Sequence, residues 1–114
     1  MKWFLLNIVA VIIFIILFPI NLFIVTIKYG FSSDYFRSDA ISLDKYGNRS
    51  YRTLFNLYLI KKHGYKFGNG NETISSVLGK NQLSNTLTKK GMLLVKFLNF
   101  IDKNHCIKSI DNLV

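Results

Sequence analysis

A single apolar stretch decides the fold of this chain: residues Trp3–Ile27 read WFLLNIVAVIIFIILFPINLFIVTI. None of these 25 residues is charged, and nineteen are Leu, Ile, Phe or Val. As a helix rising about 1.5 Å per residue, the stretch would be ~37 Å long, which exceeds the ~30 Å hydrocarbon core of a bilayer. At about 0.3–0.6 kcal/mol each, the nineteen side chains favour insertion by about 6–11 kcal/mol. The sequence therefore predicts a transmembrane anchor over residues 1–28, spanning from Trp3 through Pro19 to Ile27.

Pro19 lies inside this stretch and raises one alternative. Proline cannot donate a backbone hydrogen bond and crowds the preceding helical turn, so we expect a kink there. A re-entrant hairpin turning at Pro19 and Asn21 is the alternative, but its arms would be too short to cross and would leave backbone groups unsatisfied in lipid. The run is also too long for a signal-peptide hydrophobic region, and no small-residue cleavage site follows it, so we expect a retained span.

The rest of the chain is small and basic. Residues 28–114 number 87, near the lower limit for a domain that folds alone, and carry fourteen Lys and Arg against six acids, a net charge of +8. This charge suits an anionic lipid surface or nucleic acid. Lys28, Arg37 and Lys45 follow the span, whereas Lys2 and the α-amino group precede it. The positive-inside bias therefore places the C-terminal part on the cytoplasmic or shell-facing side.

Between the span and the C-terminal part, residues 29–47 show no sustained hydrophobic period. We interpret them as a juxtamembrane linker whose four aromatic residues can form an interfacial belt. These are Tyr29, Phe31, Tyr35 and Phe36. Residues 48–114 then form a small basic helical module, and the whole chain is predicted to be all-α.

The first half of the module contains two predicted helices. Asn48 is a plausible N-cap for a helix over 48–63 that Gly64 stops, and its apolar side faces either the core of the module or the membrane. After a turn rich in Gly and Asn, Asn71 is expected to cap a short helix over 72–78. Gly79 would end that helix, and residues 81–88 would follow as an ordered but exposed connection or as a loosely helical one.

The clearest helical pattern of the module lies at residues 89–101. Its apolar stripe is expected to face the core, with Leu93 beside it. The stripe consists of Leu94, Phe97, Leu98 and Ile101. A turn at 102–104 then leads to a last helical turn over 105–110, with Ile107 and Ile110 facing back.

The titratable residues do not form a recognisable catalytic or metal-binding motif. His105 and Cys106 are adjacent, so on a helix their side chains point about 100° apart and cannot act as a base and nucleophile pair. A zinc site needs about four ligands, whereas this chain has one Cys and two His. We expect Cys106 to be buried and His105 to bond a neighbouring backbone group or acid, with redox sensing or intermolecular coordination as the alternative. No catalytic residue, metal, cofactor or small-molecule substrate is predicted.

Lysines are distributed along the module without a groove-reading motif. Most are expected to lie on solvated faces. The residues best placed by sequence to contact a partner or an anion are Lys61, Lys62, Lys66, Lys89 and Lys90.

Two segments of the second half together carry a resemblance. They are residues 70–80, GNETISSVLGK, and residues 101–111, IDKNHCIKSID. Together they resemble a group of small phage and prophage proteins of uncharacterised function, which share an acid-Glu-Thr-Ile-Ser-Ser run ending in Gly-Lys and a His-Cys pair before a Lys-Ser-Ile tail. Here Asn71 stands where the group has an acid, and the extra cysteine before the pair is missing. The resemblance implies a viral or prophage origin and no catalytic assignment.

Anchor, charge and resemblance together predict a non-enzymatic single-pass membrane protein of phage type. We expect a structural or accessory component of a virion internal membrane that links the bilayer to capsid or other membrane subunits. A lysis or superinfection-exclusion factor of the bacterial inner membrane needs the same anchor and stays open. So does a membrane-tethered nucleic-acid-binding module, which would use the +8 charge near a genome.

Overall fold

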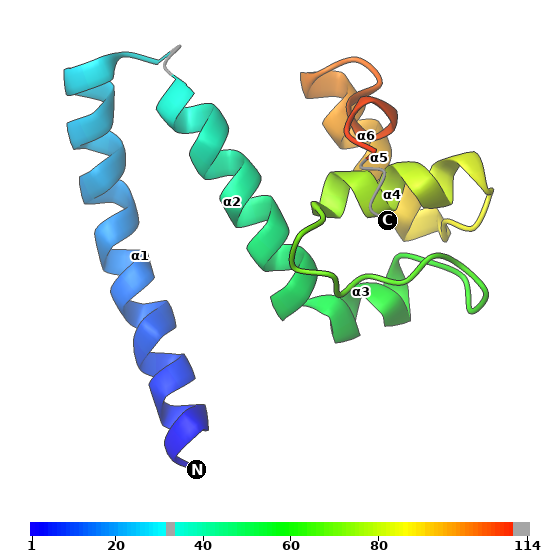
Figure 1. Ribbon diagram of the computed structural model, residues 1–114, viewed down its shortest axis with the longest axis horizontal. Helices are drawn as coiled ribbons and strands as arrows, with labels where there is room; N and C mark the ends of the chain where they lie inside the picture. Colours follow the sequence, from blue (N-terminus) through cyan, green and yellow to red (C-terminus); the bar gives the residue numbers. More distant parts are fainter. Residues whose placement is uncertain (32–33, 111–114) are drawn as a thin grey trace. The chain divides into compact units, whose positions relative to one another are not determined.

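The computed structural model describes residues 1–31 and 34–110, and its regular structure is helical throughout (Figure 1). The elements in chain order are α1 (Lys2–Tyr29), α2 (Asp34–Ser50), α3 (Arg52–Tyr58), α4 (Ile74–Leu83), α5 (Lys89–Ile101) and α6 (His105–Lys108). Within the described residues, extended pairing is limited to one isolated antiparallel bridge between Ile60 and Leu87. The predicted fold class, a long apolar N-terminal helix followed by a smaller helical part, is confirmed. The chain divides into two compact units, Met1–Asp39 and Ala40–Val114.

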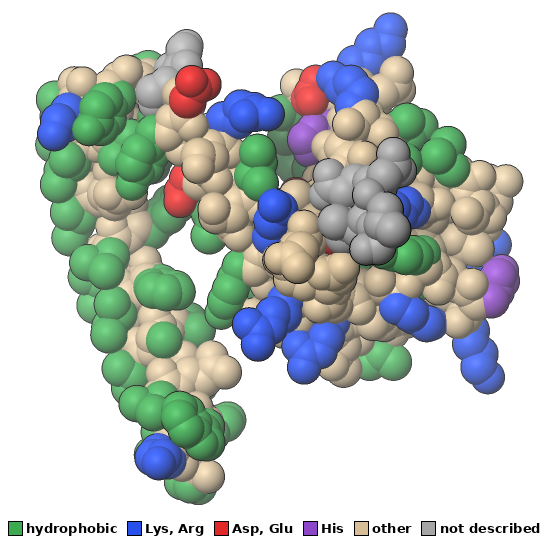
Figure 2. All heavy atoms as spheres, viewed as in Figure 1, with side chains coloured by type: hydrophobic (Ala, Val, Ile, Leu, Met, Phe, Trp, Pro, Cys, Tyr) green, Lys and Arg blue, Asp and Glu red, His purple; other side chains and the backbone are tan. Residues whose placement is uncertain are grey.

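Helix α1 is one unbroken helix of 28 residues that contains Pro19 without ending there. The re-entrant hairpin weighed above is therefore wrong. The helix ends at Gly30, whose φ of 85° favours glycine and whose N–H donates to the Thr26 carbonyl at 3.0 Å. Figure 2 shows hydrophobic side chains along the helix and cationic ones at its ends. By length and composition α1 can cross a membrane.

Helix α2 corrects the predicted linker over 29–47, because most of that range is helical; its residues 32–33 lie outside the described residues. The hydrophobic pattern failed here because two of the positions that pack are polar. Ile41, Asp44 and Asn48 share one face at i, i+3 and i+7, and all three are at least partly buried. The sequence rule equates an inward face with apolar residues, whereas this helix packs through side-chain hydrogen bonds.

Helix α3 is shorter than predicted, and Asn48 is not its N-cap. Asn48 lies within α2, while α3 covers Arg52–Tyr58. The helix over 48–63 fails because the chain leaves helical geometry after Tyr58 to pair with a distant segment. The Lys61 N–H donates to the Thr86 carbonyl at 2.7 Å, and Thr88 N–H donates to the Leu59 carbonyl at 3.0 Å. Gly64 therefore lies in a loop.

Helices α4 and α5 begin at threonines. The Thr73 hydroxyl accepts from the Ser76 N–H at 3.0 Å, so Thr73 and not Asn71 caps α4, which runs past Gly79 to Leu83. The predicted range 72–78 was too short and began two residues early. Helix α5 has the predicted bounds, and the Thr88 hydroxyl accepts from its Gly91 N–H at 3.2 Å.

The core of the second unit is small and lies between α4, α5, α6 and the loops. It consists of Ile60, Phe67, Val77, Leu78, Leu87, Val95 and Cys106. On α5, Leu94 and Leu98 pack against this core, but Leu93, Phe97 and Ile101 are exposed. The predicted stripe of α5 was thus half right.

Two close approaches of glycine to backbone hold the helices together. A Cβ at Gly91 would lie 2.2 Å from the Leu59 carbonyl oxygen, and one at Gly79 would lie 2.3 Å from the Cys106 carbonyl oxygen. These glycines let α5 approach the end of α3, and let α4 approach α6. On the α6 side, a Cβ at Gly79 would also lie 2.9 Å from Ile110, so Ile110 faces back as predicted, whereas Ile107 is 37% exposed.

Candidate functional site

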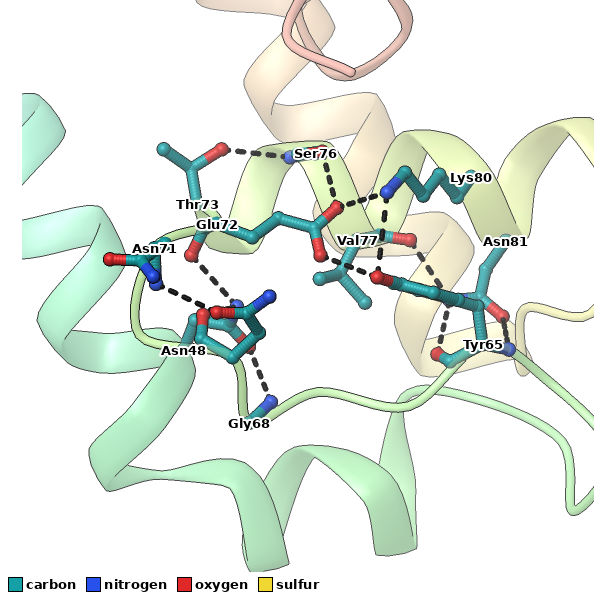
Figure 3. A network of polar contacts seen from close by, with 11 residues as sticks. Asn48, Tyr65, Gly68, Asn71, Glu72, Thr73, Ser76, Val77, Lys80 and Asn81 are labelled. Carbon is teal, nitrogen blue, oxygen red and sulfur yellow. Dashed lines mark hydrogen bonds and ion pairs between the residues drawn. The ribbon is translucent and has the colours of Figure 1, made fainter. Parts of the chain in front are cut away.

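A buried carboxylate, Glu72, forms the centre of a polar network in the second unit (Figure 3). Its Oε2 accepts from the Ser76 hydroxyl at 2.6 Å and pairs with Lys80 Nζ at 2.7 Å. Its Oε1 accepts from the Tyr65 hydroxyl at 2.7 Å. Burial alone raises the pKa of Glu72, but hydrogen bonds from Lys80, Ser76 and Tyr65 outweigh it, so the pKa lies below its ordinary value of 4.5. Glu72 is therefore a satisfied anion at neutral pH.

Two buried asparagines hold the loops around this network. Asn48 donates to the carbonyls of Asn69 and Glu72 at 2.9 and 2.8 Å, and its Oδ1 accepts from Gly68 N–H at 2.9 Å. Its side chain substitutes for backbone partners that a loop otherwise lacks.

Asn81 does the same for the loop that contains Tyr65. Its Oδ1 accepts from the Tyr65 N–H at 2.9 Å and the Thr86 hydroxyl at 2.6 Å. Its Nδ2 donates to the carbonyls of Tyr65 and Val77, both at 2.9 Å. With its amide donors and acceptor engaged by the protein, Asn81 is structural and not a ligand for a bound molecule.

A second group of polar side chains joins α2, α4 and the C-terminal segment. Ser75 Oγ donates to Asp44 Oδ2 at 3.0 Å and contacts His105 Nε2 at 3.0 Å. His105 Nδ1 contacts Asp102 Oδ2 at 2.9 Å, so His105 does bond an acid, as predicted. Hydrogen bonds from Lys108 and His105 hold the pKa of Asp102 below its ordinary value.

The Ser75, His105 and Asp102 contacts follow the order of a hydrolase triad, so this group is the chain's best catalytic candidate. Three features argue for a structural role. Ser75 is 4% exposed, its single hydroxyl proton is directed to Asp44, and Asp44 also accepts from the Ile74 N–H at 2.9 Å. A serine whose proton is held by a second carboxylate is not activated by the histidine. The group links three segments.

Cys106 is fully buried, as predicted, and lies in the core. Burial, aided by the charge of Asp44, raises the pKa of its thiol to about 11. The thiol is therefore protonated at neutral pH and shielded from oxidants. Within residues 1–31 and 34–110, no group of three His, Cys, Asp or Glu side chains could hold a metal ion.

The five predicted contact lysines lie in two places. Lys61, Lys62 and Lys66 belong to the loop after α3, where the ammonium groups of Lys61 and Lys66 donate to the backbone carbonyls of Asn85 and Lys62. Lys89 and Lys90 begin α5. On the face drawn in Figure 2, cationic side chains surround the second unit without gathering into one patch.

The predicted membrane residues all lie on α1. Lys2 Nζ lies 5.1 Å from the centre of the Trp3 ring, and Lys28 Nζ lies 5.4 Å from that of Tyr29. Each end of the helix thus carries a cation paired with an aromatic ring, the pattern that anchors spans at the two water interfaces. Ile27 is exposed beside the second pair.

Sequence reasoning missed one surface feature, the outward side of α5. Leu93, Phe97 and Phe100 share one face at i, i+4 and i+7 and are 64%, 61% and 89% exposed. Gly91 is the sequence signal that could have predicted this exposed face. A small residue inside an apolar helix indicates the side that packs closely against a neighbouring segment, so the opposite side is expected to face outward.

Comparisons with protein-family models, with curated proteins and with solved structures find no match to this chain.

Proposed function

We propose that this chain is a non-enzymatic single-pass membrane protein that presents a small basic helical unit at the bilayer surface. One observation carries the proposal: α1 is a continuous apolar helix of 28 residues with a lysine and aromatic pair at each end. A core helix of a soluble protein is covered by its own chain, whereas 6% of the most apolar window of α1 is buried.

The polar contacts within the second unit favour a role as an adaptor over a catalytic role. Its buried acid, its asparagines and its Ser75 group all bond to other parts of the same unit. These groups fix loops and helix ends, which makes the unit a platform whose outer surface meets partners.

The resemblance of residues 70–80 and 101–111 to small phage and prophage proteins supports a viral setting for the chain. In that setting the chain is a structural or accessory component of a virion internal membrane, with the second unit on the cytoplasmic or shell-facing side and capsid or membrane subunits as partners. Lysis or superinfection exclusion in a bacterial inner membrane is the competing role.

Membrane extraction and topology mapping test the proposal. The full-length chain should stay in the membrane pellet after alkaline carbonate washing, and externally added protease should cut the second unit from one side of the bilayer only. Release into the supernatant would contradict a membrane span, and a mature chain lacking Met1–Tyr29 would show a cleaved signal instead.

The setting needs a separate measurement. Purified virions that contain the chain in stoichiometric amounts would support the structural role. Loss of membrane potential when the chain is expressed alone would favour the lysis role instead.

A further inference from the structure

We infer that the outward face of α5 docks on an anionic bilayer surface, an inference that rests on the proposed function and names the surface that the second unit presents. The docking face is defined by Leu93, Phe97 and Phe100, with lysines around it. All three side chains are mostly exposed, and Phe100 is the most exposed apolar residue among residues 40–110. Exposed apolar side chains gathered on one helix face mark an interaction site.

The charges around the face select the partner. At about 100° per residue, Lys96 lies on one side of the apolar strip, Lys90 on the other, and Lys89 at its start. Helix α5 contains no acidic residue. Cations beside an apolar strip match a surface of anionic headgroups above acyl chains, because long lysine stems reach headgroups while the strip enters the boundary. A second copy of the face would oppose lysine to lysine.

A depression on the same helix repeats this combination of side chains. Lys89, Met92, Leu93 and Lys96 line a shallow hollow of about 260 Å³. Lys90 Nζ also lies 4.9 Å from the centre of the Tyr58 ring, which continues the basic and aromatic surface onto α3. Apolar walls rimmed by ammonium groups suit a lipid, whose phosphate and acyl chain need both.

The segment that joins α1 to the second unit lowers the free-energy cost of docking. Tyr29 ends α1, and Ala40 begins the second unit. The eleven Cα-to-Cα steps from Tyr29 to Ala40 reach at most about 40 Å even when fully extended, so the second unit stays near the surface that α1 enters. Docking is then intramolecular, and a weak surface affinity suffices.

A fluorescent probe on the full-length chain tests the docking. Phe100→Cys is labelled with an environment-sensitive dye and placed in nanodiscs of phosphatidylcholine alone or mixed with phosphatidylglycerol. Native Cys106 is buried and stays unlabelled. Asn71→Cys, at an exposed position outside α5, is the matched control. In discs with anionic lipid, the probe at position 100 should be shielded from acrylamide and quenched by brominated acyl chains, and the control should be neither.

Removal of the lysine charges, one at a time, tests the docking quantitatively. Each of Lys89, Lys90 and Lys96 changed to Gln should lower the docked-to-free ratio about fivefold, and high salt should have the same direction of effect. Equal acrylamide quenching of both probes in both lipids would overturn the inference while leaving the span intact. A chain that fails to enter the discs would contradict the proposed function itself.

Two further outcomes would name another occupant and overturn the inference. Shielding that depends on two chains per disc and not on anionic lipid would indicate a second copy. Shielding of the probe by duplex DNA in detergent, without a bilayer, would indicate nucleic acid.

Discussion

Helix α1 and the second unit satisfy their backbone N–H and C=O groups in different ways. Apart from its end turns and the N–H that Pro19 lacks, helix α1 satisfies its backbone through its own hydrogen bonds, and it exposes apolar side chains almost throughout. Among its described residues, the second unit has a core of seven side chains and fixes its loops with buried amides and a buried carboxylate. Helix α1 depends on being surrounded by lipid, whereas the stability of the second unit depends on individual hydrogen bonds. A substitution that disrupts one of the two regions should therefore leave the other intact.

Charges in the middle of α1 should give the largest effect. Ile13→Arg together with Ile16→Arg should cost about 6–8 kcal/mol of insertion free energy, which removes most of the favourable transfer of the span. Carbonate extraction should then find the chain in the supernatant. The matched control, Ile13→Leu with Ile16→Leu, should stay in the pellet. If the arginine variant stays there too, α1 does not span lipid.

Loss of one buried amide should come next. Asn48→Asp replaces a donor to two carbonyls with a carboxylate that faces both oxygens, so we expect a loss of about 3–4 kcal/mol. Hydrogen exchange of the full-length chain in micelles should show lost protection in residues 66–78 and unchanged protection in α1. Asn71→Asp, which is exposed, is the control. Unchanged protection near residue 68 would show that the amide is dispensable.

The same comparison explains how much the sequence could predict. Helix α1 follows from composition alone, because every side of it is apolar. The bounds of α5 follow from its apolar stripe at helical spacing. The role of Asn48 could not be predicted, because its partners lie about twenty residues away and no local period records a side chain bonded to a distant loop. For the same reason the Ser75 and His105 contact, thirty residues apart in sequence, was missed.

A smaller effect should come from Gly79, where α4 meets α6. A Cβ there would lie 2.3 Å from the Cys106 carbonyl oxygen, so Gly79→Ala should separate the two helices. Overpacking costs about 1–3 kcal/mol and better helix propensity offsets about 1 kcal/mol, which leaves a net loss of up to about 2 kcal/mol. The measurement is urea unfolding of the second unit by circular dichroism. Gly70→Ala, which meets only the flexible Arg49 side chain, should change stability little.

The mildest test uses pH on the Glu72 carboxylate. Because its folded pKa lies below its ordinary 4.5, the ionised group contributes stability above pH 4.5, and this contribution is lost as the pH falls through the folded pKa. Glu72→Gln keeps one acceptor oxygen, for either Tyr65 or Ser76, places an amide donor against the other hydroxyl and removes the ion pair with Lys80, so it should cost about 1–2 kcal/mol at pH 7. Urea unfolding should be measured at pH 7 and below pH 4.5. The difference in the free energy of unfolding between Glu72→Gln and the natural chain should shrink below pH 4.5. Membrane retention of α1 should stay constant across the same range. A difference that does not change with pH would show that Glu72 acts by shape and not by charge, and a parallel loss of retention would show that the two regions are not independent.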